Sequence, residues 1–295
     1  MKNTTLNDFL NLINYSDLNF DDFSILANAT ALNEDTGELL EFYRGPLLYS
    51  LISMLKPKQI LEFGTGFGYS ALCMAKALTD SNINGKIYTI DRKGNDEKIF
   101  RYYQLPNERV PQKNKISNKE TWKSIAPIEW IDKIIPLQGY SGVMMDENKF
   151  DNIDFCYVDG IHTYDGTKHD FLSFLKVASN NFSVLFDDYI DRDFYGVKEF
   201  IDKEVADNFD LTLINIDPNN ELKKFLKQKQ SDYGMVYLNY ISNISALTNY
   251  NEIDIDRFLK QYRSDDYRIR SRRYNIEKKI PFLKNIKFKF WENNQ

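Results

Sequence analysis

Residues 59–78 read QILEFGTGFGYSALCMAKAL, and this stretch decides the fold. Its first five residues form an apolar run that predicts a short buried strand, and its last ten have the apolar spacing of a helix. Three glycines separate the two parts at alternating positions, Gly64, Gly66 and Gly68. Glycines directly after a strand let a ligand approach the backbone and expose the amides at the start of the following helix. The stretch therefore predicts a strand, a ligand-binding turn and a helix.

The alternation of strands and helices continues along the chain. Beyond 59–63, the apolar runs predict six further strands, at 86–91, 133–137, 153–158, 182–186, 211–216 and 233–240. Helical spacing predicts helices at 43–55, 164–178 and 196–206. Strands that alternate with helices indicate an α/β fold, in which a mostly parallel seven-stranded sheet has helices on both faces. Ligands of such sheets bind beyond the carboxyl ends of the strands.

The composition predicts one main domain with additions. We expect a helical N-terminal segment at 1–45, a ligand-binding domain at 46–240 and a basic extension at 241–295. Within the domain, the polar residues 94–130 are interpreted as an insertion or mobile cover. Trp122 and Trp130 border this insertion, and packing is favoured over a role as a ligand-binding wall.

The charges are divided unevenly along the chain. The whole sequence has 38 Lys and Arg against 43 Asp and Glu, a net charge of −5 that argues against nucleic acid as the main partner. Residues 256–295 contain twelve basic and five acidic residues, or +7, which leaves −12 for the first 255. This tail has three interpretations: contact with an anionic membrane surface, an interface in a homo-oligomer, or a solvated helix packed on the acidic body. Pro281 interrupts it, which counts against a simple membrane anchor.

Other sequence features favour a cytoplasmic location. No apolar run approaches the roughly 20 residues of a membrane span, and MKNTTLNDFL at the start does not have the pattern of a signal peptide. Two cysteines, Cys73 and Cys156, are too few for a disulfide framework and lie in apolar runs expected in the core. The abundance of Asn, Lys and Ile is typical of AT-rich bacterial genomes.

Carboxylates follow two of the predicted strands. Asp159 comes directly after 153–158, and Asp187 and Asp188 come directly after 182–186. Adjacent parallel strands lie about 4.8 Å apart, so their ends bring these carboxylates together. Carboxylates this close repel one another unless a cation or protons neutralise them, and oxygen ligands favour Mg²⁺ or Mn²⁺. The alternative is that the aspartates only cap loops, but three of them together favour a metal site.

The glycine turn resembles a known family. The spacing E-x-G-x-G-x-G at 62–68 resembles the first motif of class I S-adenosylmethionine (SAM) methyltransferases, and residues 61–78 are similar to the catechol and caffeoyl-CoA O-methyltransferase branch. A nicotinamide-type turn would need glycine where Tyr69 stands. The resemblance implies a Rossmann-like class I methyltransferase fold with SAM as cofactor. Asp91, at the end of the second strand, would bind the ribose hydroxyls. The cofactor-binding residues expected in all are Glu62, Gly64, Thr65, Gly66, Tyr69, Ser70, Asp91, Ser141 and Asp159.

A second resemblance concerns the carboxylates. The pattern D-x-x-H-x-Y at 159–164, followed about 28 residues later by D-D, resembles metal-dependent sugar O-methyltransferases of the macrocin and mycinamicin type. It also resembles a broad bacterial family with the signature D-G-x-H-x-Y. Together these resemblances cover roughly residues 45–240. They imply that Asp159, Asp187 and Asp188 bind Mg²⁺ and that His162 is the general base, which makes His162 and Asp159 the expected catalytic residues. His169, the other histidine, is expected to be structural or exposed.

The chemistry of methyl transfer agrees with these roles. An aliphatic hydroxyl is a poor nucleophile near neutral pH, and a bound metal ion lowers its pKa while a histidine accepts its proton. We expect a SAM-dependent O-methyltransferase that modifies a hydroxyl of a sugar, glycan precursor or similar small polyol. Two alternatives remain open. One is a phenolic or catechol acceptor; the other is a non-catalytic module that keeps the fold and binds partners through the basic tail.

Overall fold

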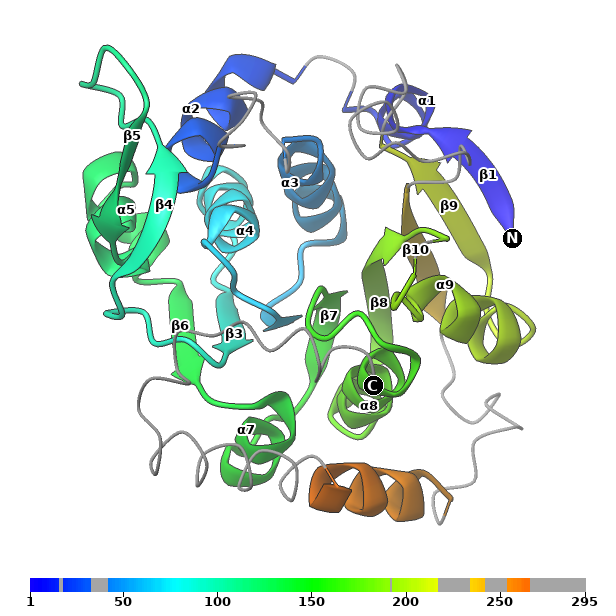
Figure 1. Cartoon of the computed structure of the whole chain (residues 1–295). Helices are drawn as coiled ribbons and strands as arrows, with labels where there is room; N and C mark the ends of the chain where they lie inside the picture. Colours follow the sequence, from blue (N-terminus) through cyan, green and yellow to red (C-terminus); the bar gives the residue numbers. More distant parts are fainter. Residues whose placement is uncertain (16–17, 33–41, 192, 217–233, 242–253, 266–295) are drawn as a thin grey trace, which may run out of the picture.

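A computed structural model describes residues 1–15, 18–32, 42–191, 193–216, 234–241 and 254–265 (Figure 1). Within these residues the main sheet has eight strands, in the spatial order β1-β9-β10-β8-β7-β2-β3-β6. All neighbours are parallel except β10, which is antiparallel to both β8 and β9. The strands are β1 (Lys2–Thr5), β2 (Gln59–Phe63), β3 (Lys86–Asp91), β6 (Ile134–Gln138), β7 (Ile153–Val158), β8 (Ala178–Tyr189), β9 (Leu211–Asn215) and β10 (Gly234–Ile241).

The expected α/β architecture is confirmed, but the expected number of strands is corrected from seven to eight. The additional strand, β1, lies within the N-terminal segment that the sequence predicts to be helical. It pairs in parallel with β9, Lys2 opposite Thr212. The four residues of β1 are polar and exposed or half-buried. Because their backbone groups make the pairing, no alternation of apolar side chains marks the strand.

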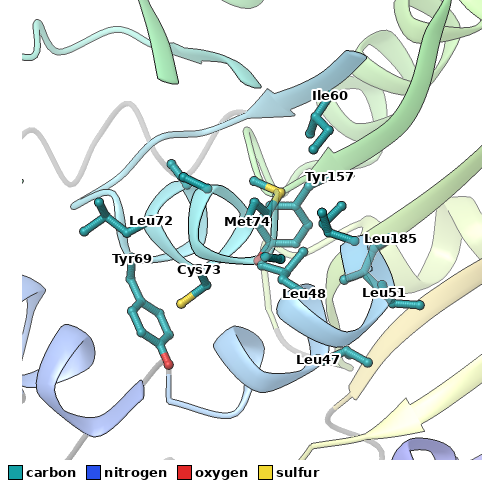
Figure 2. Close-up of a cluster of buried hydrophobic side chains, with 14 of the residues drawn as sticks. Leu47, Leu48, Leu51, Ile60, Tyr69, Leu72, Cys73, Met74, Tyr157 and Leu185 are labelled. Carbon is teal, nitrogen blue, oxygen red and sulfur yellow. The ribbon is translucent and has the colours of Figure 1, made fainter. Parts of the chain in front are cut away.

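Helices cover both faces of the sheet. On one side lie α1 (Leu6–Leu12), α2 (Phe20–Thr30), α3 (Arg44–Leu55) and α4 (Tyr69–Asp80). The close-up in Figure 2 shows apolar side chains of α3 and α4 packed against Ile60, Tyr157 and Leu185 from three neighbouring strands. On the other side lie α7 (Ser141–Glu147), α8 (Tyr164–Leu175), α9 (Val197–Phe200) and the π-helical turn η1 (Ile201–Val205).

The alternation of side chains along each strand separates the two cores. In β7, Phe155 and Tyr157 belong to the first core, whereas Cys156 and Val158 belong to the second. Both cysteines are fully buried, as expected. The second core is rich in aromatic side chains, and Phe171 of α8 lies within 6 Å of three other rings. The sheet is therefore buried on both faces, which explains why its central strands read as continuous apolar runs.

The insertion at 94–130 has secondary structure of its own. A hairpin of β4 (Ile99–Tyr103) and β5 (Gln112–Ile116) precedes α5 (Asn118–Ile125) and α6 (Ile128–Ile131), and Figure 1 shows it beside α2 and α5. The first of these helices begins with a capping box, in which Ser117 and Glu120 each bond the other's backbone amide.

Trp122 of α5 is 1% exposed and lies against Gly68, so the packing interpretation of this side chain is confirmed. A Cβ at Gly68 would come within 2.3 Å of the indole nitrogen. Trp130 of α6 is partly buried and packs against the same core.

Of the basic extension, the structure describes Ile241 and a helix over residues 254–265, which lies beside α7 and α8 (Figure 1). The stretch 266–295 is outside the described residues. Arg263 on this helix donates from Nε to Nε2 of His169 at 3.1 Å and from Nη2 to Ser173 Oγ at 3.0 Å, and it pairs with Asp146. Because a guanidinium only donates, Nε2 of His169 is the acceptor, and Nδ1–H donates to Asp170 at 2.9 Å. His169, 1% exposed, is therefore structural.

Among the residues that the structure describes, no helix combines the length and the apolar character required to cross a bilayer.

We predict that Arg263→Ala lowers the free energy of unfolding by about 2 kcal/mol, because it leaves the buried acceptor on His169 without its donor. Arg257→Ala is the matched control on the same helix. Its side chain is 75% exposed and pairs with the exposed Asp254, so a change below about 0.5 kcal/mol is expected. Urea denaturation measures both, and equal midpoints for the two variants would contradict the prediction.

Candidate functional site

The glycine turn touches the neighbouring strand end. Gly64 has a φ of 92°, and a Cβ at this position would lie 2.0 Å from the carbonyl oxygen of Asp159. Backbone hydrogen bonds fix the same contact: Asp159 N donates to Phe63 O at 2.9 Å, and Gly64 N donates to Ile90 O at 2.9 Å. Only glycine satisfies both the φ and the space. The ends of β2, β3 and β7 therefore meet here.

Asp91 lies beside the turn at the end of β3. Its Oδ2 accepts from the amide of Gly66 at 2.9 Å and its Oδ1 from the amide of Lys93 at 2.8 Å. Each oxygen of a carboxylate can accept a second hydrogen bond, so Asp91 can also bind hydroxyls. The space beside Gly66 is open, since a Cβ there would meet no atom within 4 Å. Gly66 and Asp91 together form a surface that a ligand can approach.

Four other predicted cofactor residues have side chains that are buried and make hydrogen bonds within the protein. Ser70 donates to the fully buried Glu62, and the hydroxyls of Thr65 and Thr89 are 2.6 Å apart. Tyr69 is 2% exposed; its ring lies in the core shown in Figure 2 and its hydroxyl donates to the carbonyl of Phe42 at 2.7 Å. We therefore assign the side chains of Glu62, Thr65, Tyr69 and Ser70 a role in shaping the turn.

Ser141 is the first residue of α7 and is half-buried. The preceding β6 is joined to β3 by a hydrogen bond from Gly139 N to the carbonyl of Asp91 at 2.8 Å. Ser141 thus follows a strand end that lies next to Asp91, in the position that the sequence predicts.

A cluster of two carboxylates and an imidazole, called here the acidic cluster, lies at the carboxyl ends of β7 and β8. Asp159, His162 and Asp188 each place one potential ligand atom within 4.8 Å of the others. Nδ1 of His162 lies 2.9 Å from Oδ2 of Asp188, and the imidazole stacks on Tyr195 with ring centroids 5.0 Å apart. Asp188 has a φ of 52°, a left-handed conformation that Asp and Asn tolerate better than most residues. The His162 ring is thereby held at a fixed orientation.

Asp187 lies apart from this cluster, although the sequence predicts that it joins Asp159 and Asp188 as a metal ligand. Its carboxylate pairs with Nε of Arg44 at 2.7 Å and accepts from the hydroxyl of Tyr157 at 2.6 Å. Arg44 and Tyr157, and not the cluster, therefore engage the carboxylate of Asp187. The structure instead groups His162 with Asp159 and Asp188.

Arg44 and Tyr157 are site residues that the sequence analysis does not identify. Arg44 begins α3 and contacts both Asp187 and Asp188. Its Nη2 lies 3.4 Å from Oδ1 of Asp188. Tyr157 lies two residues before Asp159 and so points to the same side of β7, which is a signal present in the sequence. No local signal connects Arg44 with residues about 140 positions later.

Burial and charge alter the proton affinities in the site. Burial raises the pKa of Asp187, and the charge of Asp188 adds to this effect while Arg44 opposes it. Burial acts to lower the pKa of His162, but its hydrogen bond to Asp188 and the charges of Asp188 and Asp187 outweigh that effect and raise the pKa above 6.5. Burial raises the pKa of Tyr157 well above its usual value, as do Asp159 and Asp187. Tyr157 therefore remains a hydrogen-bond donor.

The chain matches a known family over its central part. Residues 61–189 match the family described as "Methyltransferase domain", and this span contains the glycine turn, Asp91 and all three members of the acidic cluster. Over these residues the match agrees with the expected class of enzyme, a methyltransferase. The fold is the expected α/β, Rossmann-like fold of methyltransferases, with a large, mostly parallel sheet.

A relative and two solved structures illustrate the similarity. The uncharacterized protein y4gI of Sinorhizobium fredii is 25% identical over 144 residues, which are 49% of this chain and only 14% of that protein's length. The O-methyltransferase TomG from Streptomyces achromogenes, in complex with SAM, is 18% identical and has a TM-score of 0.47, over 74% of this chain and 89% of that one. An O-methyltransferase from Bacillus cereus, in complex with SAH, is 15% identical with a TM-score of 0.45, over 81% and 92%.

We predict that Arg44→Met lowers the free energy of unfolding by about 3 kcal/mol or more, because it leaves the buried carboxylate of Asp187 without its cation. The two side chains of this pair are 12% and 0% exposed. Lys203→Met breaks an exposed pair with Glu199 and is expected to cost less than about 0.5 kcal/mol. Chemical denaturation of both variants decides the matter: a loss at Arg44 no larger than at Lys203 would mean that the buried pair contributes little.

Proposed function

We propose that this chain is a SAM-dependent O-methyltransferase whose acceptor is a hydroxyl of a sugar or a similar small polyol. The observation that carries the proposal is a backbone contact. Gly64 of the glycine turn touches Asp159, the first residue of the loop after β7. On this proposal, the surface that binds the cofactor adjoins the loop that carries the imidazole of His162. The methyltransferase domain match over residues 61–189 supports the same reading.

The residues around the turn fit SAM. Asp91 has acceptor capacity for ribose hydroxyls, and the backbone at Gly66 borders open space. Ser141 follows the neighbouring strand end, where the resemblance places the adenosine. When bound, SAM supplies a methyl group on a positively charged sulfur, and the chain has to aim the acceptor oxygen at that group.

His162 is the proposed general base. Because Nδ1 faces Asp188 at 2.9 Å, Nε2 is the nitrogen that takes the proton from the acceptor hydroxyl. The carboxylate of Asp188 fixes the orientation of the ring and stabilises the imidazolium that results. Stacking on Tyr195 restricts the ring further.

The acidic cluster also fits a divalent cation. Asp159 and Asp188 are carboxylate ligands of the kind that Mg²⁺ and Mn²⁺ prefer, and they would hold the ion while His162 acts as the base. A bound ion would orient the hydroxyls of the acceptor and lower the pKa of the one that reacts. Asp187, which is neutralised by Arg44, would support the site without contacting the ion. This arrangement supports a polyol acceptor, since two neighbouring hydroxyls can share one cation.

A catechol also has neighbouring hydroxyls, so the acceptor class needs a direct test. Phenolic hydroxyls ionise far more readily than those of sugars and depend less on a base. Turnover assays with sugar and catechol acceptors distinguish the two. If only catechols are methylated, the sugar assignment fails.

The proposal makes a prediction about binding of the cofactor. Calorimetric titration with S-adenosylhomocysteine is expected to give a dissociation constant of about 1–100 μM. Asp91→Ala should weaken binding about tenfold or more, because it removes both acceptors for the ribose. Asp96→Ala is the matched control, an exposed carboxylate on the segment after β3 that pairs with Lys119. Folded, cofactor-free protein that releases no heat would argue for the alternative of a non-catalytic module.

The proposal also makes a prediction about the acidic cluster. Asp188→Asn keeps a residue that tolerates the left-handed backbone and removes the charge that orients His162, so turnover should fall about 100-fold or more. Binding of S-adenosylhomocysteine should change little, because Asp188 lies outside the turn. Chelation of divalent ions should abolish turnover and addition of Mg²⁺ or Mn²⁺ should restore it. Full activity in metal-free buffer would remove the metal from the proposal and leave the pair of His162 and Asp188.

A further inference from the structure

Arg101 is a buried cation that has no carboxylate partner among the residues that the structure describes. It belongs to β4 of the hairpin and is 4% exposed. Its Nη2 donates to the side-chain oxygen of Asn118, whereas Nε and Nη1 are buried and have no hydrogen-bond partner within the described ranges. Burial lowers the pKa of Arg101 to about 10, so the guanidinium is still protonated at neutral pH. A buried charge with unused donors is costly unless an anion completes it.

Arg101 is one of the residues that line a cavity. A space of about 160 Å³ lies between the hairpin, the end of α2 and the glycine turn. Arg101 and Lys113 supply its positive charge, and Phe67, Phe100 and Tyr102 supply aromatic walls. This volume accommodates a phosphate or carboxylate together with part of the molecule that carries it. The cavity has basic and aromatic lining residues, whereas the acidic cluster consists of two carboxylates and an imidazole.

The orientation of Arg101 suits recognition of an anion. Its guanidinium lies over the ring of Phe67, with the central carbon 4.5 Å from the ring centroid. A guanidinium stacked in this way has one face covered, and its N–H groups remain directed outward from the edge in a fork that matches two oxygens of an anion. The contact with Phe67 compensates part of the burial cost, but it does not use the donors.

The cavity is connected to the glycine turn. Phe67 stands between Gly66 and Gly68, and Asn118 donates from Nδ2 to the carbonyl of Gly66 at 3.2 Å. Asn118 therefore bridges the guanidinium of Arg101 and the turn. A group bound at Arg101 would therefore lie beside the proposed cofactor surface.

From these contacts we infer that the cavity binds an oxyanion, either a phosphate or a carboxylate, carried by a small ligand. On the assumption that the proposed function holds, this ligand is the methyl acceptor, which would then be a sugar phosphate or a sugar acid rather than a neutral sugar. Nε or Nη1 of Arg101, together with the second N–H of Nη2, would bind two oxygens of the anion, and Lys113 would add charge at the edge of the cavity.

Binding of simple anions to the full-length protein tests the inference. Thermal unfolding is followed while inorganic phosphate, or in a second series acetate, replaces chloride at constant ionic strength. The wild-type protein should show a saturable rise in midpoint with at least one anion, and the anion that saturates at the lower concentration identifies the class of oxyanion. Arg101→Gln should weaken this binding about tenfold or more. Absence of a saturable response to either anion in the wild type would overturn the inference.

Two further variants make the test specific. Lys119→Gln removes an exposed positive charge from α5 of the same insertion and should bind the anion as the wild type does. Arg101→Lys keeps the charge without the fork, so it should retain only part of the affinity, and it replaces Arg101→Gln in the comparison if that variant does not fold. Equal binding by the Arg101 variants and the wild type would mean that the anion binds elsewhere.

The anion titration uses neither SAM nor turnover, so its outcome is independent of the proposed function. Phosphate binding without binding of S-adenosylhomocysteine would retain the anion site and reject the methyltransferase proposal. The reverse result would retain the proposal and reject the anion site.

Discussion

The contact between Gly64 and the carbonyl of Asp159 is the constraint on which the rest of the site depends. With any side chain at position 64, the ends of β2 and β7 would have to separate, because its Cβ would come within 2.0 Å of that oxygen. The glycine turn follows β2, and the loop that begins with Asp159 follows β7. Their closeness is therefore a property of the sheet, fixed by backbone hydrogen bonds at Phe63 and Ile90, and it does not depend on flexible side chains.

Most of the fold could be predicted from the sequence because its central strands are buried on both faces and therefore read as apolar runs. The same reasoning locates the glycine turn and the strand-end carboxylates. It fails for β1, whose polar residues join the sheet through the backbone alone. It also fails for the hairpin β4–β5, since segments rich in Lys, Asn and Gln are typical of loops and do not reveal the pairing.

In the site, too, the sequence predicts some of the contacts and not others. Position along a strand predicts that Asp159 and Asp188 meet near His162, but the carboxylate of Asp187 is engaged by Arg44 and Tyr157. Its partner, Arg44, comes from a helix at the other end of the domain sequence, and only the assembled fold brings the two together. Arg101 is a comparable case, since nothing in its local sequence distinguishes a buried guanidinium from the many exposed ones.

The packing of Trp122 against Gly68 has a practical consequence. The indole is buried, and it is held against the first residue before α4, so its emission depends on the immediate surroundings of the glycine turn. The chain contains three tryptophans. Replacing Trp130 and Trp291 with phenylalanine would leave Trp122 as an intrinsic fluorescent reporter, through which occupancy of the turn could be followed in real time without a label.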